Sequence, residues 1–152
     1  MIVEAIPSDA ELLTKIALAS KAFWKYTQEQ LDGWIDELTI TSGYLSKTSA
    51  FVYKVNGTIV GFYIIDMLNT TTISLEFLFV LPKFIGKGVG HQLINHALEN
   101  ARTKKGFVLK TLSDPNAESF YAKYGFKIIS LQESSIPGRF LPEMELEFPE
   151  NK

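Results

Sequence analysis

The sequence has no cysteine, and only two of its 152 residues are histidines. Without cysteine the chain has no disulfide, no thiolate nucleophile and no cysteine-ligated zinc site. The two histidines, His91 and His96, could share one face of a helix, but the segment HQLINH lacks the glutamate of the HExxH zinc motif. We therefore expect no metal site.

The chain also lacks a long apolar run and an excess of basic charge. No stretch approaches the roughly 18 apolar residues of a membrane helix, and the opening MIVEAIPSDAELL does not fit a signal peptide. Fifteen basic and seventeen acidic residues give a formal net charge of -2. We expect no nucleic-acid or membrane partner, and the cytoplasm as the default compartment.

What is present is typical of a globular domain. The length of 152 residues predicts one domain over residues 1–152, with a hydrophobic fraction of 46%. After a first strand within residues 1–6, Ser8 and Glu11 form a capping-box pattern before a helix. A second helix is expected from Thr27, which forms a capping-box pattern with Gln30. Its expected apolar face consists of Leu31, Trp34, Ile35 and Leu38.

Strands dominate the second half of the chain. Residues 50–55 and 58–66 read as a hairpin closed by Asn56-Gly57, and further strands are expected at 73–80, 107–112, 126–131 and 140–148. A long helix is expected over 88–105, ended by Gly106, and a shorter one from Asp114-Pro115 to Gly125. The order predicts a mixed sheet with helices on its faces.

Three glycines separate the strand at 73–80 from the long helix. Gly86, Gly88 and Gly90 allow the backbone to approach a ligand closely, and the first N–H groups of the helix favour an anion such as a phosphate. Lys83 and Lys87 add positive charge. The alternative is a flexible loop with incidental glycines. Neither the dinucleotide fingerprint nor the Walker A pattern is present, which leaves the pyrophosphate of a larger carrier molecule.

Two segments resemble the GNAT superfamily of N-acetyltransferases. The acetyl-CoA loop of that family, Q/R-x-x-G-x-G/A, is similar to the segment from Ile85 to Gly90, although Ile85 departs from the usual Gln or Arg. Downstream, DPNAESFYAKYGF looks like the family's N-x-x-A/S-x-x-F-Y-x-x-x-G-F segment. The close match spans about 74–129. The resemblance implies an α+β fold with a central mixed, mostly antiparallel twisted sheet of about six to seven strands, flanked by about four helices.

The same resemblance implies acetyl-CoA as co-substrate and direct transfer of its acetyl group to a primary amine. Backbone N–H groups near Phe79 and Val80 would stabilise the oxyanion. Two alternatives remain: a non-catalytic acyl-CoA-binding sensor on the same fold, and a nucleotide-binding module of another class. The residues expected to bind acetyl-CoA are Phe79, Val80, Gly86, Lys87, Gly88, Val89, Gly90, His91, Asn116 and Phe120.

Two side chains are candidates for the proton transfers that the reaction needs. Glu76 is the candidate base, because it is the only charged residue of its strand and burial would raise its pKa. A strand covered on both sides favours this role over that of an exposed surface residue. Tyr121 matches the residue that relatives place near the CoA sulfur, and the alternative is a packing role. Asn116 either caps its helix or bonds the pantetheine arm.

An aromatic cluster lies where relatives build the acceptor pocket: Phe23, Trp24, Tyr26, Trp34 and Tyr44. Trp34 is expected in the core, whereas Trp24 and Tyr26 are expected to bind the acceptor, with Arg139 on the opposite wall. The acceptor is predicted to be a small-molecule or peptide amine, and the sequence does not identify it. A homodimer is left open.

Overall fold

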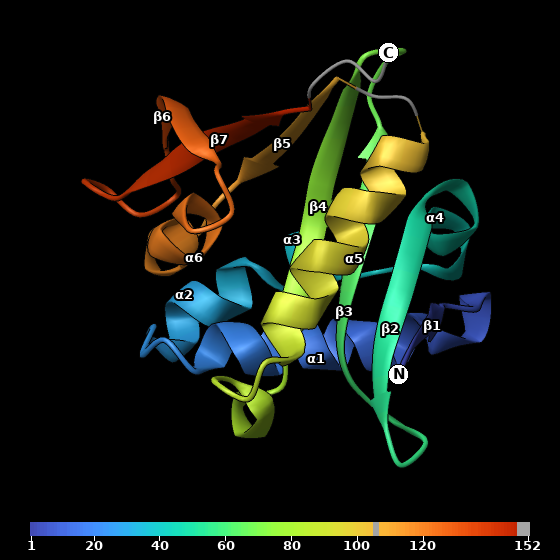
Figure 1. Cartoon of the computed structure of the whole chain (residues 1–152). Coiled ribbons are helices and arrows are strands. Elements are labelled where there is room, and N and C mark those ends of the chain that lie inside the picture. The colour runs from blue at the N-terminus through green and yellow to red at the C-terminus, as the bar shows by residue number, and fades with distance from the viewer. Residues whose placement is uncertain (105–106, 149–152) are drawn as a thin grey trace.

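A computed structural model of the chain describes residues 1–104 and 107–148. Its seven strands form one sheet in the order β1-β2-β3-β4-β5-β7-β6 (Figure 1). Every neighbouring pair is antiparallel except β4 and β5, which confirms the expected mixed, mostly antiparallel sheet. The strands are β1 (Ile2–Glu4), β2 (Ser49–Val55), β3 (Thr58–Met67), β4 (Thr72–Val80), β5 (Val108–Leu112), β6 (Lys127–Glu133) and β7 (Phe140–Glu147).

The described residues contain six α-helices rather than about four. The expected second helix is divided at Trp34, and the short helix before β2 was not predicted. None of the described helices is long and apolar enough to cross a membrane. The helices are α1 (Ala10–Ala22), α2 (Gln28–Gly33), α3 (Ile35–Leu38), α4 (Ser42–Lys47), α5 (Val89–Thr103) and α6 (Glu118–Ala122).

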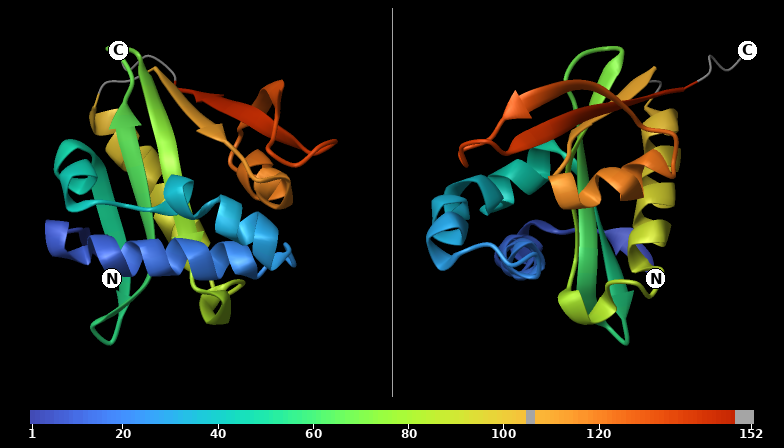
Figure 2. Two further views of the ribbon diagram at one scale, coloured as in Figure 1. Left: turned by 180° about the vertical axis from the view of Figure 1, so that it is seen from behind. Right: turned by 90° about the vertical axis from the view of Figure 1, so that its left-hand side faces the viewer.

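Helices α1 and α5 cover opposite faces of the sheet (Figure 2). The face under α5 carries one buried apolar cluster, and the face under α1 carries a second. Because β3 lies between the two, its central residues are buried on both sides. The predicted inner face of α5 is confirmed, since all six of its residues are buried: Val89, Leu93, Ile94, Ala97, Leu98 and Ala101.

Two local signals in the sequence are confirmed by backbone geometry. Asn56 and Gly57 adopt φ angles of 51° and 80°, the left-handed conformations of a tight hairpin turn. The Thr27 hydroxyl accepts from the Gln30 N–H at 3.1 Å, and the Gln30 side chain accepts from the Thr27 N–H at 3.0 Å. This pair caps α2 as expected.

Other local predictions need correction. The Ser8–Glu11 box is absent, because a 3-10 turn over Pro7–Asp9 precedes α1 and the Asp9 carboxylate accepts from the Ile6 N–H instead. Ile35 is 43% exposed, since the chain turns at Trp34 and rotates it away from the core. A 3-10 turn over Pro115–Ala117 delays α6 to Glu118. The predicted helix end at Gly106 lies outside the described residues.

The feature of the sheet that positions the site is the separation of β4 from β5. The two strands pair only from Thr72–Ser74 to Val108–Lys110 and then diverge, as Figure 1 shows. β4 also carries a bulge, because Ile65 pairs with Leu75 and Ile64 pairs with Phe77, leaving Glu76 as the extra residue. Bulges bend a strand and redirect a side chain. The divergence opens the sheet where Glu76 stands.

Candidate active site

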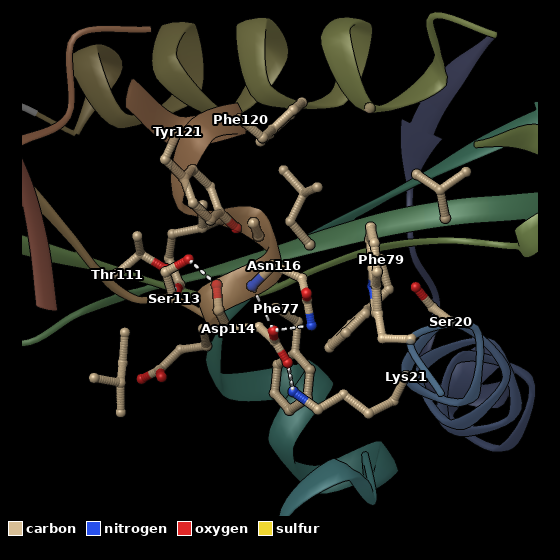
Figure 3. A pocket seen from close by; sticks show the side chains of 18 of the residues that line it. Ser20, Lys21, Phe77, Phe79, Thr111, Ser113, Asp114, Asn116, Phe120 and Tyr121 are labelled. Atoms are coloured by element: carbon tan, nitrogen blue, oxygen red, sulfur yellow. Dashed lines mark hydrogen bonds and ion pairs between the residues drawn. The ribbon is translucent and has the colours of Figure 1, made fainter. Parts of the chain in front are cut away.

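A cleft of about 950 Å³ occupies the opening between β4 and β5. It is bordered by α1, by the turn before α5, by the segment before α6, and by the loop between β6 and β7. Figure 3 shows part of its lining. Twelve of the fifteen predicted site residues line it: Trp24, Glu76, Phe79, Val80, Gly86, Gly88, Gly90, His91, Asn116, Phe120, Tyr121 and Arg139.

Three predicted site residues do not line the cleft. Val89 is buried beneath the glycine turn, and Lys87 is exposed with its ammonium 5.8 Å from the centre of the Phe84 ring. The Tyr26 hydroxyl contacts Asp114 and Arg139, which themselves line the cleft. The Val89 and Tyr26 side chains therefore act on a ligand through their neighbours and Lys87 acts through its charge, whereas the backbone N–H of Val89 belongs to the first turn of α5.

Glu76 points into a partly open part of the cleft. The expectation that both faces of the strand would cover it is wrong: the bulge and the departure of β5 leave the side chain exposed. Partial burial of its carboxyl and the nearby Asp66 carboxylate still raise the pKa of Glu76, and a hydrogen bond from Ser74 offsets part of this effect. A carboxylate with a raised pKa is a stronger base.

Tyr121 stands on α6 and reaches the cleft with only 6% of its surface exposed. Burial raises the pKa of its phenol to about 12, the Asp114 carboxylate adds to this effect, and the Thr111 hydroxyl reduces it. The phenol is therefore protonated at neutral pH and available as a donor. Its ring also packs against Phe120 and Phe126, with centroids 5.3 and 5.4 Å away, so the packing role coexists with a position on the cleft.

The glycine turn has the geometry of an anion cradle. Gly86 and Gly88 adopt φ angles of 79° and 86°, which disfavour any side chain, and apart from adjacent residues no atom of the described chain lies within 4 Å of a Cβ placed at either residue. Gly88 precedes α5 directly, so the unpaired N–H groups of the first helical turn face the same opening. The space, the dipole and the free donors together fit a phosphate group.

Asn116 does not cap its helix as one alternative held. Asp114 caps the 3-10 turn over Pro115–Ala117, because its carboxylate accepts from the Asn116 backbone N–H at 2.8 Å, and α6 itself begins at Glu118 without a side-chain cap. The Asn116 side-chain amide donates to the Asp114 carboxylate and the Tyr26 hydroxyl. Asn116 is exposed at the cleft edge.

The two histidines of α5 contact different tyrosines. The His91 ring lies 2.6 Å from the Tyr124 hydroxyl on the cleft side, whereas His96 bonds Tyr63 under the other part of α5. Among residues 1–104 and 107–148, no group of three or more His, Asp or Glu side chains is arranged to hold a metal ion.

Two charged residues that pair in the cleft, Lys21 and Asp114, were not predicted as site residues, whereas Arg139 was. Lys21 reaches from α1 to Asp114 with a nitrogen–oxygen distance of 2.5 Å (Figure 3), and Arg139 approaches the same carboxylate at 3.0 Å. Burial by itself raises the pKa of Asp114, but the Lys21 ammonium and the Asn116 N–H outweigh burial and lower it. The sequence indicated Asp114 only as the start of a helix, and no motif or spacing in the sequence predicted its contact with Lys21.

Only part of the predicted aromatic cluster lines the cleft. Trp24, Trp34 and Tyr44 line the cleft, while Phe23 is 46% exposed outside it. Trp34 is buried as expected, and it also contributes to the cleft lining. Burial, followed by the Glu76 and Asp66 carboxylates, raises the pKa of Tyr44 well above its usual range.

Comparison with known families gives one match. A family model described as "Acetyltransferase (GNAT) domain" matches residues 46–128, which include β2 to β5, the glycine turn, α5 and α6. No curated protein sequence matches the chain at a significant level.

Several solved structures share the fold. A GCN5-related N-acetyltransferase from Rhodopseudomonas palustris superimposes with a TM-score of 0.80 and 24% identity, covering 97% of this chain and 95% of that one. The PaiA N-acetyltransferase from Thermoplasma acidophilum, solved with coenzyme A, gives 0.79 and 20%, covering 97% and 98%. A GNAT family acetyltransferase from Elizabethkingia anophelis with acetyl-CoA bound gives 0.66 and 21%, covering 97% of each chain. At these identities the likeness concerns the fold.

Proposed function

The chain belongs to the GNAT acetyltransferase family, and from this premise we propose that it passes the acetyl group of acetyl-CoA directly to a primary amine. We propose further that residues 1–152 form one such domain. The observation that carries the proposal is the meeting of three features in one cleft: the glycine turn, Tyr121 and Glu76. Each was predicted from a different part of the sequence.

The residues of the cleft fit acetyl-CoA as a substrate. The open space at Gly86 and Gly88 and the first turn of α5 would receive the pyrophosphate. Among the described residues β4 has no partner strand on the β5 side beyond Ser74, so its edge near Phe79 and Val80 is available to the pantetheine arm and to an oxyanion. Asn116 and Phe120 border the path towards Tyr121.

Each of the two candidate residues transfers one proton in the reaction. An amine attacks a thioester only when it is neutral, and a lysine-like amine has a pKa of about 10.4. Glu76 accepts the amine proton, directly or through water, as the carbon–nitrogen bond forms. Tyr121 gives its proton to the sulfur as the carbon–sulfur bond breaks, and solvent restores both groups. The absence of cysteine is consistent with this direct route.

The acceptor is a small-molecule or peptide amine. Trp24, Trp34 and Tyr44 supply aromatic surface on the side of the cleft opposite α6, and Glu76 supplies negative charge that attracts an ammonium group. This combination favours an amine of limited size entering between α1 and the β6–β7 loop.

The test is turnover. Purified protein is mixed with acetyl-CoA and a panel of primary amines, and free CoA is measured with a thiol reagent, to which this cysteine-free protein adds no background. We expect amine-dependent CoA release that Tyr121→Phe reduces. Tight acetyl-CoA binding without release by any amine would instead favour the non-catalytic sensor.

The edge strand β6 supports a homodimer as part of the proposal. All seven of its residues are exposed, and Ile128, Ile129 and Leu131 are 47%, 47% and 60% exposed. An exposed apolar edge strand favours association. Sedimentation at micromolar concentration tests it, and a monomer throughout would contradict it.

A further inference from the structure

Two cations share one carboxylate on the acceptor side of the cleft. Lys21, Asp114 and Arg139 all line the cleft, and their side chains are only 15%, 14% and 14% exposed. They come from α1, from the end of β5 and from the β6–β7 loop. The triad has a formal charge of +1, held where solvent screens it poorly.

The two cations are fixed in place by aromatic rings. The Lys21 ammonium lies 5.0 Å from the centre of the Trp34 ring, and the Arg139 guanidinium carbon lies 5.0 Å from the centre of the Tyr26 ring. Tyr26 and Trp34 pack edge to face at 4.8 Å. The Tyr26 hydroxyl also accepts a hydrogen bond of 2.7 Å from Arg139. Cations held in this way are already ordered before a ligand arrives.

Lys21 and Arg139 have hydrogen-bond donors to spare, whereas the Asp114 carboxylate is already well supplied. The Asp114 carboxylate already accepts from Lys21, Tyr26, Arg139 and Asn116. Lys21 has three N–H donors and bonds only Asp114 among the described residues, while Arg139 has five and uses only Nη2. Within that part of the chain no fully buried side-chain nitrogen or oxygen is unpaired. The spare donors therefore face the cleft or solvent.

We propose that Lys21 and Arg139 bind a carboxylate carried by the acceptor, so that the acceptor is an amino acid or another aminocarboxylate. The inference rests on the proposed function, because it places the acceptor amine at Glu76. The cleft then has an anionic part at Glu76 and a cationic part at Lys21 and Arg139, which matches a zwitterion. The other charged residues of the lining, Glu37 and Lys123, are exposed and form no ion pair within the described residues.

The experiment compares each aminocarboxylate with the amine that remains when its carboxylate is removed. Suitable pairs are lysine with cadaverine, phenylalanine with phenethylamine, and 4-aminobutyrate with propylamine, which vary the spacing between the two groups. We expect kcat/KM to be at least about 10-fold higher for the carboxylate member of the preferred pair, the effect of one charge-assisted hydrogen bond. Equal or better turnover of the decarboxylated member of every pair overturns the proposal.

The decisive variant is Arg139→Gln. It leaves the Lys21–Asp114 ion pair in place and removes the surplus charge, so it exposes no new unpaired carboxylate. We expect KM for the carboxylate acceptor to rise about 10-fold, with KM for its decarboxylated partner and for acetyl-CoA unchanged. Arg139→Lys, which keeps the charge, restores part of the loss. If KM for acetyl-CoA rises instead, the bound anion is a phosphate of CoA, and the proposal is wrong.

A binding measurement separates this inference from the proposed function. Calorimetry on CoA-saturated protein records the affinity of both members of each pair without requiring turnover. Preferential binding of the carboxylate member, lost in Arg139→Gln, supports the inference even if no amine is acetylated. Equal affinity for both members overturns it even if acetyl transfer is observed.

Discussion

At the scale of single residues, the two candidate proton-transfer groups differ in burial. Tyr121 is almost fully buried, and its pKa of about 12 keeps the phenol protonated at any pH where the protein would work. Glu76 is exposed on a bulge, and its raised pKa results from partial burial and from Asp66. Acetyl transfer to an amine needs a protonated donor for the leaving sulfur and a base for the amine proton, and a carboxylate with a raised pKa is a stronger base.

Replacing Tyr121 by phenylalanine removes one hydroxyl and keeps the ring that packs against Phe120 and Phe126. We expect kcat to fall by about 10²-fold, because thiolate departure loses its proton donor, while KM for acetyl-CoA is nearly unchanged. Steady-state kinetics and a melting curve measure both effects. Wild-type turnover in the folded variant would make Tyr121 a packing residue only.

Replacing Glu76 by glutamine keeps the shape and removes the base. A base matters most where the amine is protonated, so the deficit should be largest just above the pKa of Glu76 and should shrink as pH rises towards about 10.4. In the wild type, activity falls at acid pH as Glu76 becomes protonated, and its raised pKa places this fall above the usual glutamate range. Rate profiles of both proteins are compared. A deficit independent of pH would mean that another acceptor-side residue takes the proton.

At the scale of elements, periodicity and turn signals predicted what depends on neighbouring residues. The buried face of α5, the Asn56-Gly57 hairpin and the Thr27 cap are all settled within a few residues of sequence. The bulge at Glu76 depends on how β4 and β3 pair, and the break at Trp34 depends on packing against distant segments, including a hydrogen bond to Ser135. Such long-range causes leave no local pattern.

The glycine turn gives an element-level test that separates binding from folding. A Cβ at Gly90 would lie 3.5 Å from the nearest atom of Phe120, an ordinary contact, and the residue is helical. Gly90→Ala should therefore leave the fold intact or stabilise it by up to about 1 kcal/mol. It also places a methyl group on the cleft lining, so acetyl-CoA affinity should fall.

Gly43→Ala is the matched control for the Gly90 variant. Gly43 is also helical, and apart from adjacent residues and the backbone of its own helix no atom of the described chain lies within 4 Å of an added Cβ, but Gly43 lies outside the cleft lining. Thermal melts and acetyl-CoA titrations of the two variants should differ only in affinity. Unchanged affinity in Gly90→Ala would remove the turn from the binding site.

At the scale of the whole molecule, Asp114 ties together segments that are far apart in sequence, through Lys21 and Arg139. Asp114→Asn leaves two nearly buried cations without their counter-ion, so we expect a loss of about 3 kcal/mol in the free energy of unfolding at pH 7. Glu99→Gln, which removes a surface ion pair with Arg102, should cost less than about 1 kcal/mol. Urea denaturation measures both losses.

The stabilisation that Asp114 contributes to the fold depends on pH, and the direction of this dependence follows from its pKa. The pKa of Asp114 is lower in the folded chain than in the unfolded chain, where an aspartate has a pKa of about 3.9. Its contribution is therefore complete above about pH 4 and is lost as pH falls through the folded value. The wild type and Asp114→Asn should differ most at neutral pH and converge in acid. A difference that stays constant down to pH 3 would show that the charge of Asp114 does not stabilise the fold.

Acetyl-CoA should stabilise the whole chain, because its proposed site joins the turn before α5 to α6 across the gap in the sheet. A ligand that binds only the folded state at 100 times its Kd adds about 2.7 kcal/mol. For a chain of this size that corresponds to a rise in Tm of roughly 5 to 10 °C.

NAD and ATP, tested at the same concentrations, should give no comparable rise, because the turn lacks the sequence patterns that bind them. Gly90→Ala should need more acetyl-CoA to reach the same shift, whereas Gly43→Ala should follow the wild type. An unchanged Tm with saturating acetyl-CoA, together with a rise on adding NAD or ATP, would mean that the cleft binds a different nucleotide.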